Sequence, residues 1–293
     1  MTARFLAAAV LSVLLTATGN SDTQAADEPA KDGTMKFARF RINDHTAFGI
    51  VEGDSVRELS GSIFGEWSKT DTVHSLSDVR LLVPTQPKHV FAMAGNYKSH
   101  LNDAEIPPLF RIPQPFFKSP SSLVRHEGNI VLPKNATEEV HFEAEMVVVI
   151  GKRAKDVSKE EALDYVLGVT CGNDVSERFW QNDENHKDVQ WWRAKGADTF
   201  GPCGPFIVSG LNYDDLLLTL RLNGEVKQEE RTSQMIHDVA TQISFITQHV
   251  TLLPGDLIFT GTSGTTSALH AGDVVEVELE GVGILRNKVV AEK

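Results

Sequence analysis

Cysteine is scarce in this chain of 293 residues, which contains two, Cys171 and Cys203. Neither belongs to a Cys-x-x-Cys pair or to a spacing typical of zinc sites, so a redox dithiol motif and a cysteine-ligated metal site are excluded. The sequence favours two buried free thiols. A disulfide between them stays open, because connectivity does not follow from sequence.

Positive charge is also in short supply. Asp and Glu number 40 against 28 Lys and Arg, which gives a net charge of −12 with neutral histidines. This balance argues against nucleic acid or an anionic membrane as a primary partner. An anionic small-molecule substrate would then need a local cation, either a metal ion or positioned Lys and Arg side chains.

Long apolar runs are confined to the N-terminus. Arg4 precedes the apolar run Phe5 to Leu15, and small residues follow up to Ala25. This pattern predicts a secretory signal peptide over residues 1–25, with cleavage after Ala25 or Ala26. An uncleaved N-terminal anchor is the alternative, but the run is short for a membrane span. We therefore expect a periplasmic or secreted protein with no membrane attachment after cleavage.

Two structural units are expected after this segment. Residues 26–34 are polar and predict a flexible lead-in, and residues 35–85 show short apolar segments separated by turn residues. That pattern predicts the antiparallel hairpins of a small N-terminal β domain. The main, catalytic domain is expected over residues 86–293, and the apolar content of 41% is enough for a packed core.

Helical signals are few in the main domain. Ser158 and Glu161 have the spacing of a capping box, which predicts a short helix ending at Gly168. Apolar residues at spacings of three and four predict a longer helix over residues 237–250. The segment from Leu101 to Pro120 holds five prolines and is predicted to be a loop.

Two carboxylates stand at the start of an apolar strand. Glu143 and Glu145 are two residues apart, so their side chains lie on the same face of that strand. The run from Met146 to Ile150 is typical of a buried strand, where carboxylates need a partner or a metal ion. Asp174, after the next predicted strand, adds a third acidic ligand. We predict a site for Mg2+, with Mn2+ and Ca2+ as alternatives; a solvated strand face and an Asx turn are the competing interpretations.

Five sequence blocks carry a resemblance to a known family. The blocks are Gly95–His100, Phe142–Gly151, Gly172–Arg178, Arg193–Pro202 and Pro254–Thr262. In this order, and within about residues 87–290, they resemble the fumarylacetoacetate hydrolase family and its fumarylacetoacetase C-terminal-like domain. The resemblance implies a β-rich α+β fold, a mixed β-sandwich or β-roll with a few helices, and a homodimer.

The resemblance also assigns roles to residues at matching positions. It implies metal ligation by Glu143, Glu145 and Asp174, and an active-site lysine and a general base at Lys195 and His100. It implies substrate contacts at three further positions, Arg178, Gln181 and Thr262, the last of them to a substrate carboxylate.

The sequence departs from the family pattern at two positions. Hydrolytic members with a histidine–glutamate pair have the glutamate three residues after the histidine, and here Asp103 stands at that distance from His100. Asp103 would orient the base with a side chain one methylene shorter. Ser263 follows the Gly-Thr pair where the family usually has proline, which affects the loop that binds the substrate carboxylate.

The expected function is that of an exported, divalent-metal-dependent hydrolase. Its substrate would be an acylpyruvate or a related β-diketo acid, whose adjacent oxygens suit a metal ion and whose C–C bond would be cleaved. One alternative is an isomerase, tautomerase or decarboxylase of a hydroxymuconate- or oxaloacetate-like oxo acid with the same metal site. A second alternative is a non-catalytic protein that binds a metal–keto-acid complex.

Overall fold

The structure of the protein is a computed structural model that describes residues 33–102 and 105–293. The predicted signal peptide at residues 1–25 and the predicted base partner Asp103 lie outside the described residues. Within the described ranges, no helix is both long enough and apolar enough to span a membrane.

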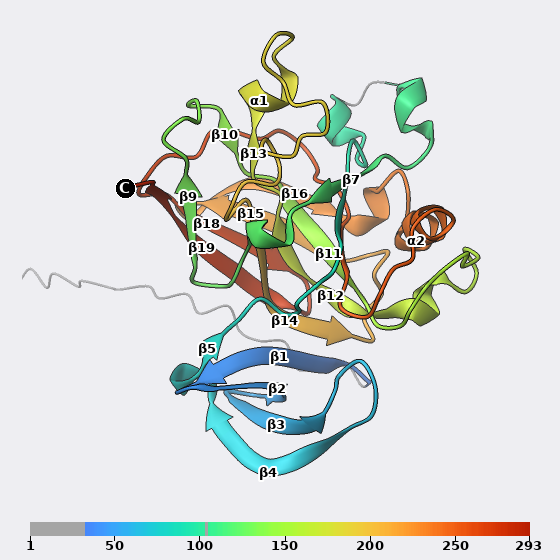
Figure 1. Cartoon of the computed structure of the whole chain (residues 1–293), viewed down its shortest axis with the longest axis vertical. Coiled ribbons are helices and arrows are strands. Elements are labelled where there is room, and N and C mark those ends of the chain that lie inside the picture. The colour runs from blue at the N-terminus through green and yellow to red at the C-terminus, as the bar shows by residue number, and fades with distance from the viewer. Residues whose placement is uncertain (1–32, 103–104) are drawn as a thin grey trace, which may run out of the picture.

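One large sheet of twelve strands includes strands of both the N-terminal segment, residues 35–85, and the main domain (Figure 1). Its main path follows the order β4-β3-β2-β1-β14-β12-β11-β17-β6-β7, with β5 beside β1 and β8 beside β14. Its N-terminal strands are β1 (Met35–Ile42), β2 (His45–Glu52), β3 (Ser55–Gly61), β4 (Trp67–Ser75) and β5 (Arg80–Leu81). Its other strands are β6 (Val90–Met93), β7 (Pro115–Lys118), β8 (Leu123–Val124), β11 (Ala144–Ile150), β12 (Val166–Asn173), β14 (Gly201–Ser209) and β17 (Leu257–Phe259).

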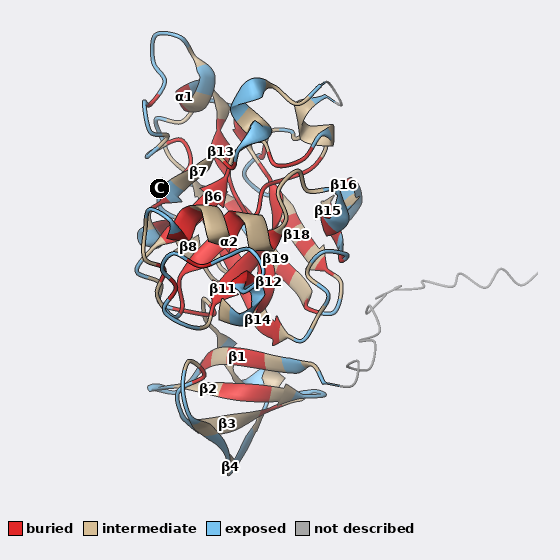
Figure 2. Cartoon of the chain, turned by 90° about the vertical axis from the view of Figure 1, so that its right-hand side faces the viewer, coloured by how far each residue is buried: buried red, intermediate tan, exposed pale blue. Residues whose placement is uncertain are grey.

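The N-terminal strands form an antiparallel meander at one end of the molecule, at the bottom of Figure 1. They join the main body through the antiparallel pairing of β1 with β14, in which Phe37 lies opposite Ile207. Both side chains are buried in the same apolar cluster. The meander therefore continues the large sheet, although it is seen as a separate lobe in Figure 2.

A second sheet of five strands packs against the large one. Its order is β16-β15-β18-β19-β9, and β18 and β19 form an antiparallel hairpin near the C-terminus. The strands are β9 (Asn129–Leu132), β15 (Leu217–Leu222), β16 (Glu225–Arg231), β18 (Val274–Leu279) and β19 (Gly283–Ala291). A short pair, β10 (Val140–His141) with β13 (Ser176–Glu177), completes the strands.

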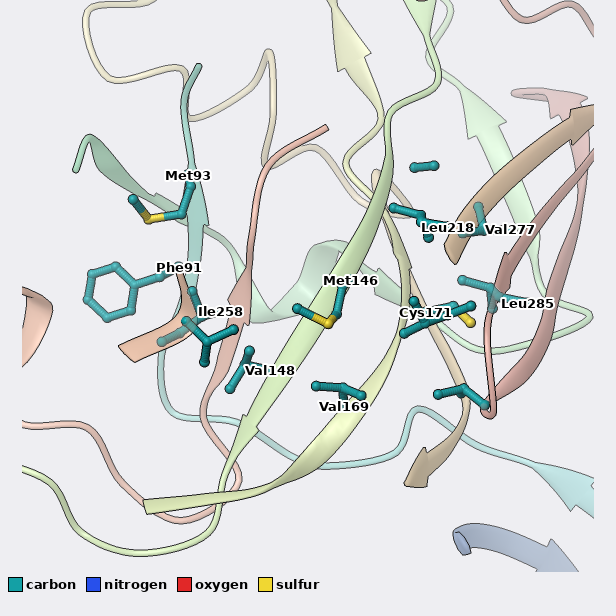
Figure 3. Packing of buried hydrophobic residues seen from close by; sticks show 14 of the residues in the cluster. Phe91, Met93, Met146, Val148, Val169, Cys171, Leu218, Ile258, Val277 and Leu285 are labelled. Atoms are coloured by element: carbon teal, nitrogen blue, oxygen red, sulfur yellow. The ribbon is translucent and has the colours of Figure 1, made fainter. Parts of the chain in front are cut away.

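β11 is buried on both faces, because it lies between two apolar clusters. Met146 and Val148 belong to the cluster that reaches Leu218 of the five-stranded sheet (Figure 3). Val147 belongs to the second cluster, with Phe259 of β17. This position explains why the strand is a continuous apolar run with no polar alternation.

Helices are few and short within residues 33–102 and 105–293. They are α1 (Arg178–Asn182) and α2 (Val239–Thr247), together with several single 3₁₀ turns. The helix predicted over residues 237–250 corresponds to α2. The observed helix is shorter than the prediction at both ends. It begins after Asp238, whose carboxylate caps it by accepting a hydrogen bond from the Thr241 amide at 2.8 Å. The prediction of a β-rich α+β fold with a few helices is confirmed.

The helix predicted from the capping box is wrong. Only a 3₁₀ turn at Ala162–Tyr165 forms, and it has no side-chain cap. Ser158 Oγ instead donates to the Glu161 carboxylate at 3.0 Å. β12 begins at Val166, so the chain has four residues between the box and the strand, fewer than a stable α-helix needs.

Both cysteines are buried free thiols, as the sequence favoured. They lie on the neighbouring strands β12 and β14, one residue out of register with each other. Burial raises the pKa of Cys171 to about 12 and raises that of Cys203 as well. Neither thiol is therefore a reactive thiolate at neutral pH.

Candidate metal centre and its surroundings

The three predicted acidic ligands meet at one end of the β11–β12 pair. The strands are antiparallel with Ala144 opposite Asn173, so the end of β12 lies beside the start of β11. The Asn173 side chain accepts a hydrogen bond from the Glu143 amide at 2.9 Å, and the Asp174 amide donates to the Glu143 carbonyl at 2.9 Å. These bonds fix the chain on both sides of the site.

Glu143, Glu145 and Asp174 form a compact, buried cluster. One carboxylate oxygen from each lies within 4.8 Å of the others. The residues are 4%, 1% and 1% exposed, which excludes the solvated strand face as an interpretation. Carboxylates that are buried this deeply require cations close by.

Three cationic side chains surround the cluster. Lys195 Nζ donates to Glu143 Oε2 at 2.7 Å and to Asp174 Oδ2 at 2.8 Å. Lys118 Nζ donates to Asp174 Oδ1 at 2.6 Å and also to the Lys195 carbonyl. Arg178 places a guanidinium nitrogen 2.6 Å from Glu143 Oε1. Glu143 and Asp174 are therefore paired, whereas Glu145 has no cationic hydrogen-bond partner among the described residues.

The electrostatics differ sharply between the two glutamates. Burial would raise the pKa of Glu143, but the charges of Lys195 and Arg178 outweigh it and hold that pKa well below its usual range. Burial and the charges of Asp174 and Glu143 raise the pKa of Glu145 well above its usual range. The charge of Lys195 and the hydrogen bond from the Gly261 amide act on Glu145 in the opposite direction but do not outweigh these two causes.

A divalent cation fits this donor set. Glu145 Oε2 accepts from the Gly261 amide at 2.8 Å, but its Oε1 is buried and has no hydrogen-bond partner in the part of the chain that the structure describes. An unpartnered carboxylate oxygen next to two more carboxylates is what a hard cation with oxygen ligands requires. Glu143, Glu145 and Asp174 could hold such an ion.

His100 lies at the edge of the cluster. It belongs to a 3₁₀ turn at Ser99–Leu101, and its Nδ1 is 2.8 Å from the Gly264 carbonyl. Since a carbonyl only accepts, Nδ1 carries a proton, and the neutral form of the ring presents a lone pair on Nε2. Nε2 lies 3.9 Å from Glu143 Oε1, and the side chain is 24% exposed. The ring can therefore exchange a proton with a molecule bound at the cluster.

The loop 261–266 closes the site on the side of Glu145. Gly261 has a φ of +100°, and a Cβ there would meet Asn96 Cβ at 2.7 Å, so glycine is required for its amide to reach Glu145. Thr262 is buried, and its hydroxyl accepts from Gln228 Nε2 at 2.9 Å. Thr266 accepts a hydrogen bond from Arg178 at 2.9 Å.

The structure brings most of the residues predicted for the site together. Gln181 is at the periphery and accepts from Arg178 at 2.8 Å, so it holds the guanidinium and does not touch the carboxylates. Lys195 is deeply buried, at 3% exposed.

Sequence reasoning missed Lys118, Gln228 and Tyr97. Lys118 ends the apolar strand β7, and a lone lysine after three apolar residues was a usable signal. Gln228 lies in a highly charged strand, where one buried amide cannot be told from its neighbours. Tyr97 was within a recognised block but carries no chemistry that sequence alone indicates.

The buried hydroxyl of Tyr97 leads to a prediction about the stability of the protein. Its hydroxyl is buried and has no hydrogen-bond partner among the described residues. Burial and the charges of Glu145 and Glu230 raise its pKa, so it stays protonated. An unpaired buried hydroxyl costs about 1–3 kcal/mol. We expect Tyr97→Phe to leave the metal-free protein as stable as the wild type, or more stable, in urea unfolding. A clear loss of stability would show that the hydroxyl is paired in solution.

Two family models match this chain. The model for the fumarylacetoacetate (FAA) hydrolase C-terminal domain matches residues 89–290, and the Rv2993c-like N-terminal model matches residues 35–84. Protein Rv2993c of Mycobacterium tuberculosis is 41% identical over 269 residues, covering 87% of this chain and 98% of that protein.

Several relatives and solved structures have names that state an activity, among them a hydrolase and an isomerase. The 2,4-didehydro-3-deoxy-L-rhamnonate hydrolase of a Sphingomonas species is 35% identical, covering 87% of this chain and 96% of that protein. The crystal structure of 2-hydroxyhepta-2,4-diene-1,7-dioate isomerase from Mycobacterium marinum superposes with a TM-score of 0.80 at 40% identity. It covers 88% of this chain and 99% of the isomerase chain.

Proposed function

This chain belongs to the fumarylacetoacetate hydrolase family, and from that premise we propose that it is an exported, divalent-metal-dependent hydrolase of short oxo acids. The substrate class is an acylpyruvate or a related β-diketo acid, and the reaction cleaves a C–C bond. One observation carries the proposal: the Nε2 lone pair of His100 faces a buried cluster of three carboxylates from 3.9 Å. The hydrolase named among the relatives supports the reaction class.

The proposed cofactor is Mg2+, held by Glu143, Glu145 and Asp174. Bound there, it would polarise the oxo acid's carbonyl groups and stabilise negative charge that develops on them. Mn2+ and Ca2+ also prefer oxygen ligands and are tested alongside it.

The protein's own residues perform the proton transfer and the binding. His100 accepts a proton from water at Nε2 while the water oxygen forms a bond to the distal carbonyl carbon. The C–C bond then breaks, and its electron pair forms the enolate of the keto acid, which takes the proton from His100 Nε2 to give the keto-acid product. Lys195 supplies positive charge where oxyanion character develops.

The substrate carboxylate would bind at the edge of the cluster. Arg178 is 16% exposed there, and its guanidinium suits bidentate recognition of a carboxylate. The Thr262 hydroxyl lies nearby on the loop 261–266, in the position that the family pattern assigns to the substrate carboxylate. Both groups orient the substrate and take no part in the proton transfer.

A substrate panel tests the proposal. The purified protein is incubated with Mg2+ and short acylpyruvates, and pyruvate release is followed by a coupled assay. We expect turnover that a chelator removes and that added Mg2+ or Mn2+ restores. Binding of the oxo acids with no product of any kind would overturn the enzymatic function in favour of a binding protein.

Isomerisation or tautomerisation is the second candidate. The isomerase structure at 40% identity supports it. So does the hydrogen bond of His100 Nδ1 to a backbone carbonyl, since in the described part of the chain no carboxylate activates the ring from that side. NMR in D2O distinguishes the two reactions. Isomerisation exchanges a carbon-bound proton for deuterium and converts one substrate molecule into one product molecule, whereas hydrolysis yields two acids.

Export and a homodimer stay predictions. Recovery of the chain from a periplasmic or secreted fraction, without residues 1–25, would support export. Light scattering on the purified protein measures its oligomeric state.

A further inference from the structure

One face of β16 points towards the loop that closes the metal centre. Gln228 and Glu230 are two residues apart and both turn inward, whereas Lys227 and Glu229 are exposed, as the period of a strand requires. Gln228 Nε2 donates to the Thr262 hydroxyl and to the Ser263 carbonyl, and its Oε1 accepts from the backbone of β11. This residue ties the loop 261–266 to the acidic strand.

Glu230 acts on the same loop through a serine. Ser99 Oγ donates to Glu230 Oε2 at 2.8 Å and accepts from the Gly264 amide at 3.0 Å. Glu230 is half-buried, and a hydrogen bond to a carboxylate is shorter and stronger than one between neutral groups. Donation to Glu230 also makes the serine oxygen a better acceptor for the Gly264 amide.

Gly264 is held from both sides by neighbouring residues of one turn. Its amide donates to Ser99, and its carbonyl accepts from Nδ1 of His100 at 2.8 Å. Gly264 has a φ of +57°, so its orientation depends on a conformation that glycine adopts without strain. Movement of this residue would move the acceptor that selects the Nδ1–H tautomer of the histidine.

We propose that Ser99 and Glu230 are positioning residues for His100. Through Gly264 they fix the ring orientation and hold the proton on Nδ1, which leaves Nε2 free at the carboxylate cluster. The catalytic consequence rests on the proposed function, but the geometric claim does not. In the described residues, no carboxylate contacts Nδ1 of His100 directly, so this indirect connection to Glu230 supplies the orientation.

NMR of the histidine ring tests the geometric claim. Protein labelled with 15N-histidine is studied at a pH where the imidazole is neutral, and His100→Gln identifies the signal. We expect the Nδ1–H tautomer in the wild type. Ser99→Ala and Glu230→Ala should give a mixture of tautomers, and Glu230→Gln, whose amide oxygen still accepts from Ser99, should remain closer to the wild type. Glu229→Gln, on the opposite face of β16, is the matched control.

Kinetics on the same variants test the consequence. We expect kcat to fall about 10- to 100-fold in Ser99→Ala and Glu230→Ala with KM little changed, since misplacement of a catalytic group affects the chemical step. Glu229→Gln should match the wild type. Urea unfolding shows whether each variant is folded, and Glu230→Gln retains the hydrogen bond if Glu230→Ala is unstable.

The outcomes of the two measurements are separable. An unchanged tautomer in both Ser99→Ala and Glu230→Ala overturns the proposal, as does an Nε2–H tautomer in the wild type. A rise in KM alone also overturns it, because the residues would then act on binding. Absence of turnover on every oxo acid would refute the proposed function, while the NMR result would still decide the positioning role.

Discussion

Replacing His100 with glutamine is expected to lower kcat by about 10²- to 10⁴-fold, the usual contribution of a general acid–base residue. Glutamine keeps a donor that can reach the Gly264 carbonyl, which accepts from Nδ1 at 2.8 Å in the wild type. It has no group that can take a proton at neutral pH. The loss should therefore fall on kcat, because His100 does not contribute a ligand to the acidic cluster.

His141 provides the matched control for this prediction. It is also close to the site, where its Nδ1 bonds the Thr266 hydroxyl at 2.9 Å, and burial lowers its pKa. His141→Gln should change kcat far less than His100→Gln. Steady-state rates on the preferred oxo acid and Mg2+ titration by calorimetry measure both variants. Equal losses in the two, or loss of metal affinity in His100→Gln, would contradict the assignment of the base.

Replacing Lys195 with methionine is expected to destabilise the metal-free protein by about 3–5 kcal/mol, the cost of removing one partner from a buried charge pair. Lys195 bonds Glu143 and Asp174 at once, and all three side chains are buried. Burial would lower the pKa of Lys195, but the two carboxylates outweigh it and raise that pKa. The ammonium is therefore charged at neutral pH, and its removal leaves two carboxylates undercompensated.

Added Mg2+ should restore much of the stability that Lys195→Met loses. A cation that binds the folded state alone stabilises it in proportion to the logarithm of its concentration above Kd. The carboxylates of Lys195→Met gain more from that charge than those of the wild type. Urea unfolding followed by tryptophan fluorescence, with and without Mg2+, measures the difference. The variant should show the larger increase in the free energy of unfolding.

Lys118→Met is the comparison variant. Lys118 is equally buried, but burial lowers its pKa despite the charge of Asp174. Its removal leaves Asp174 paired with Lys195. We expect a smaller loss of stability than in Lys195→Met. If Lys118→Met is the more damaging change in metal-free protein, Lys118 is the principal countercharge and the roles of the two lysines must be exchanged.

The sequence determined what was local in this protein. Strand periodicity placed Glu143 and Glu145 on one face, and the run after them predicted a buried strand. Both follow from the alternation of side chains along a single segment.

Local signals failed where neighbouring elements competed with them. The capping box at Ser158 predicted a helix, but the chain is a strand from Val166 onward. Side chains of this strand, β12, are buried in the apolar cluster shared with the five-stranded sheet. The helix predicted over residues 237–250 was too long at its start for a similar reason: the His237 amide donates to Asn96 Oδ1 at 2.9 Å, and α2 begins only after Asp238. Tertiary pairing overrides propensity in both cases.

Only the tertiary structure decided how the acidic cluster is balanced. The carboxylates come from two adjacent strands, but their cations come from Lys118, Arg178 and Lys195 on separate segments. The link from Glu230 to His100 passes through Ser99, which lies 131 residues before Glu230 in the sequence, and through Gly264. Charge and hydrogen-bond partners of this kind depend on the distances between segments in the folded protein. The periodicity of a single segment does not predict those distances.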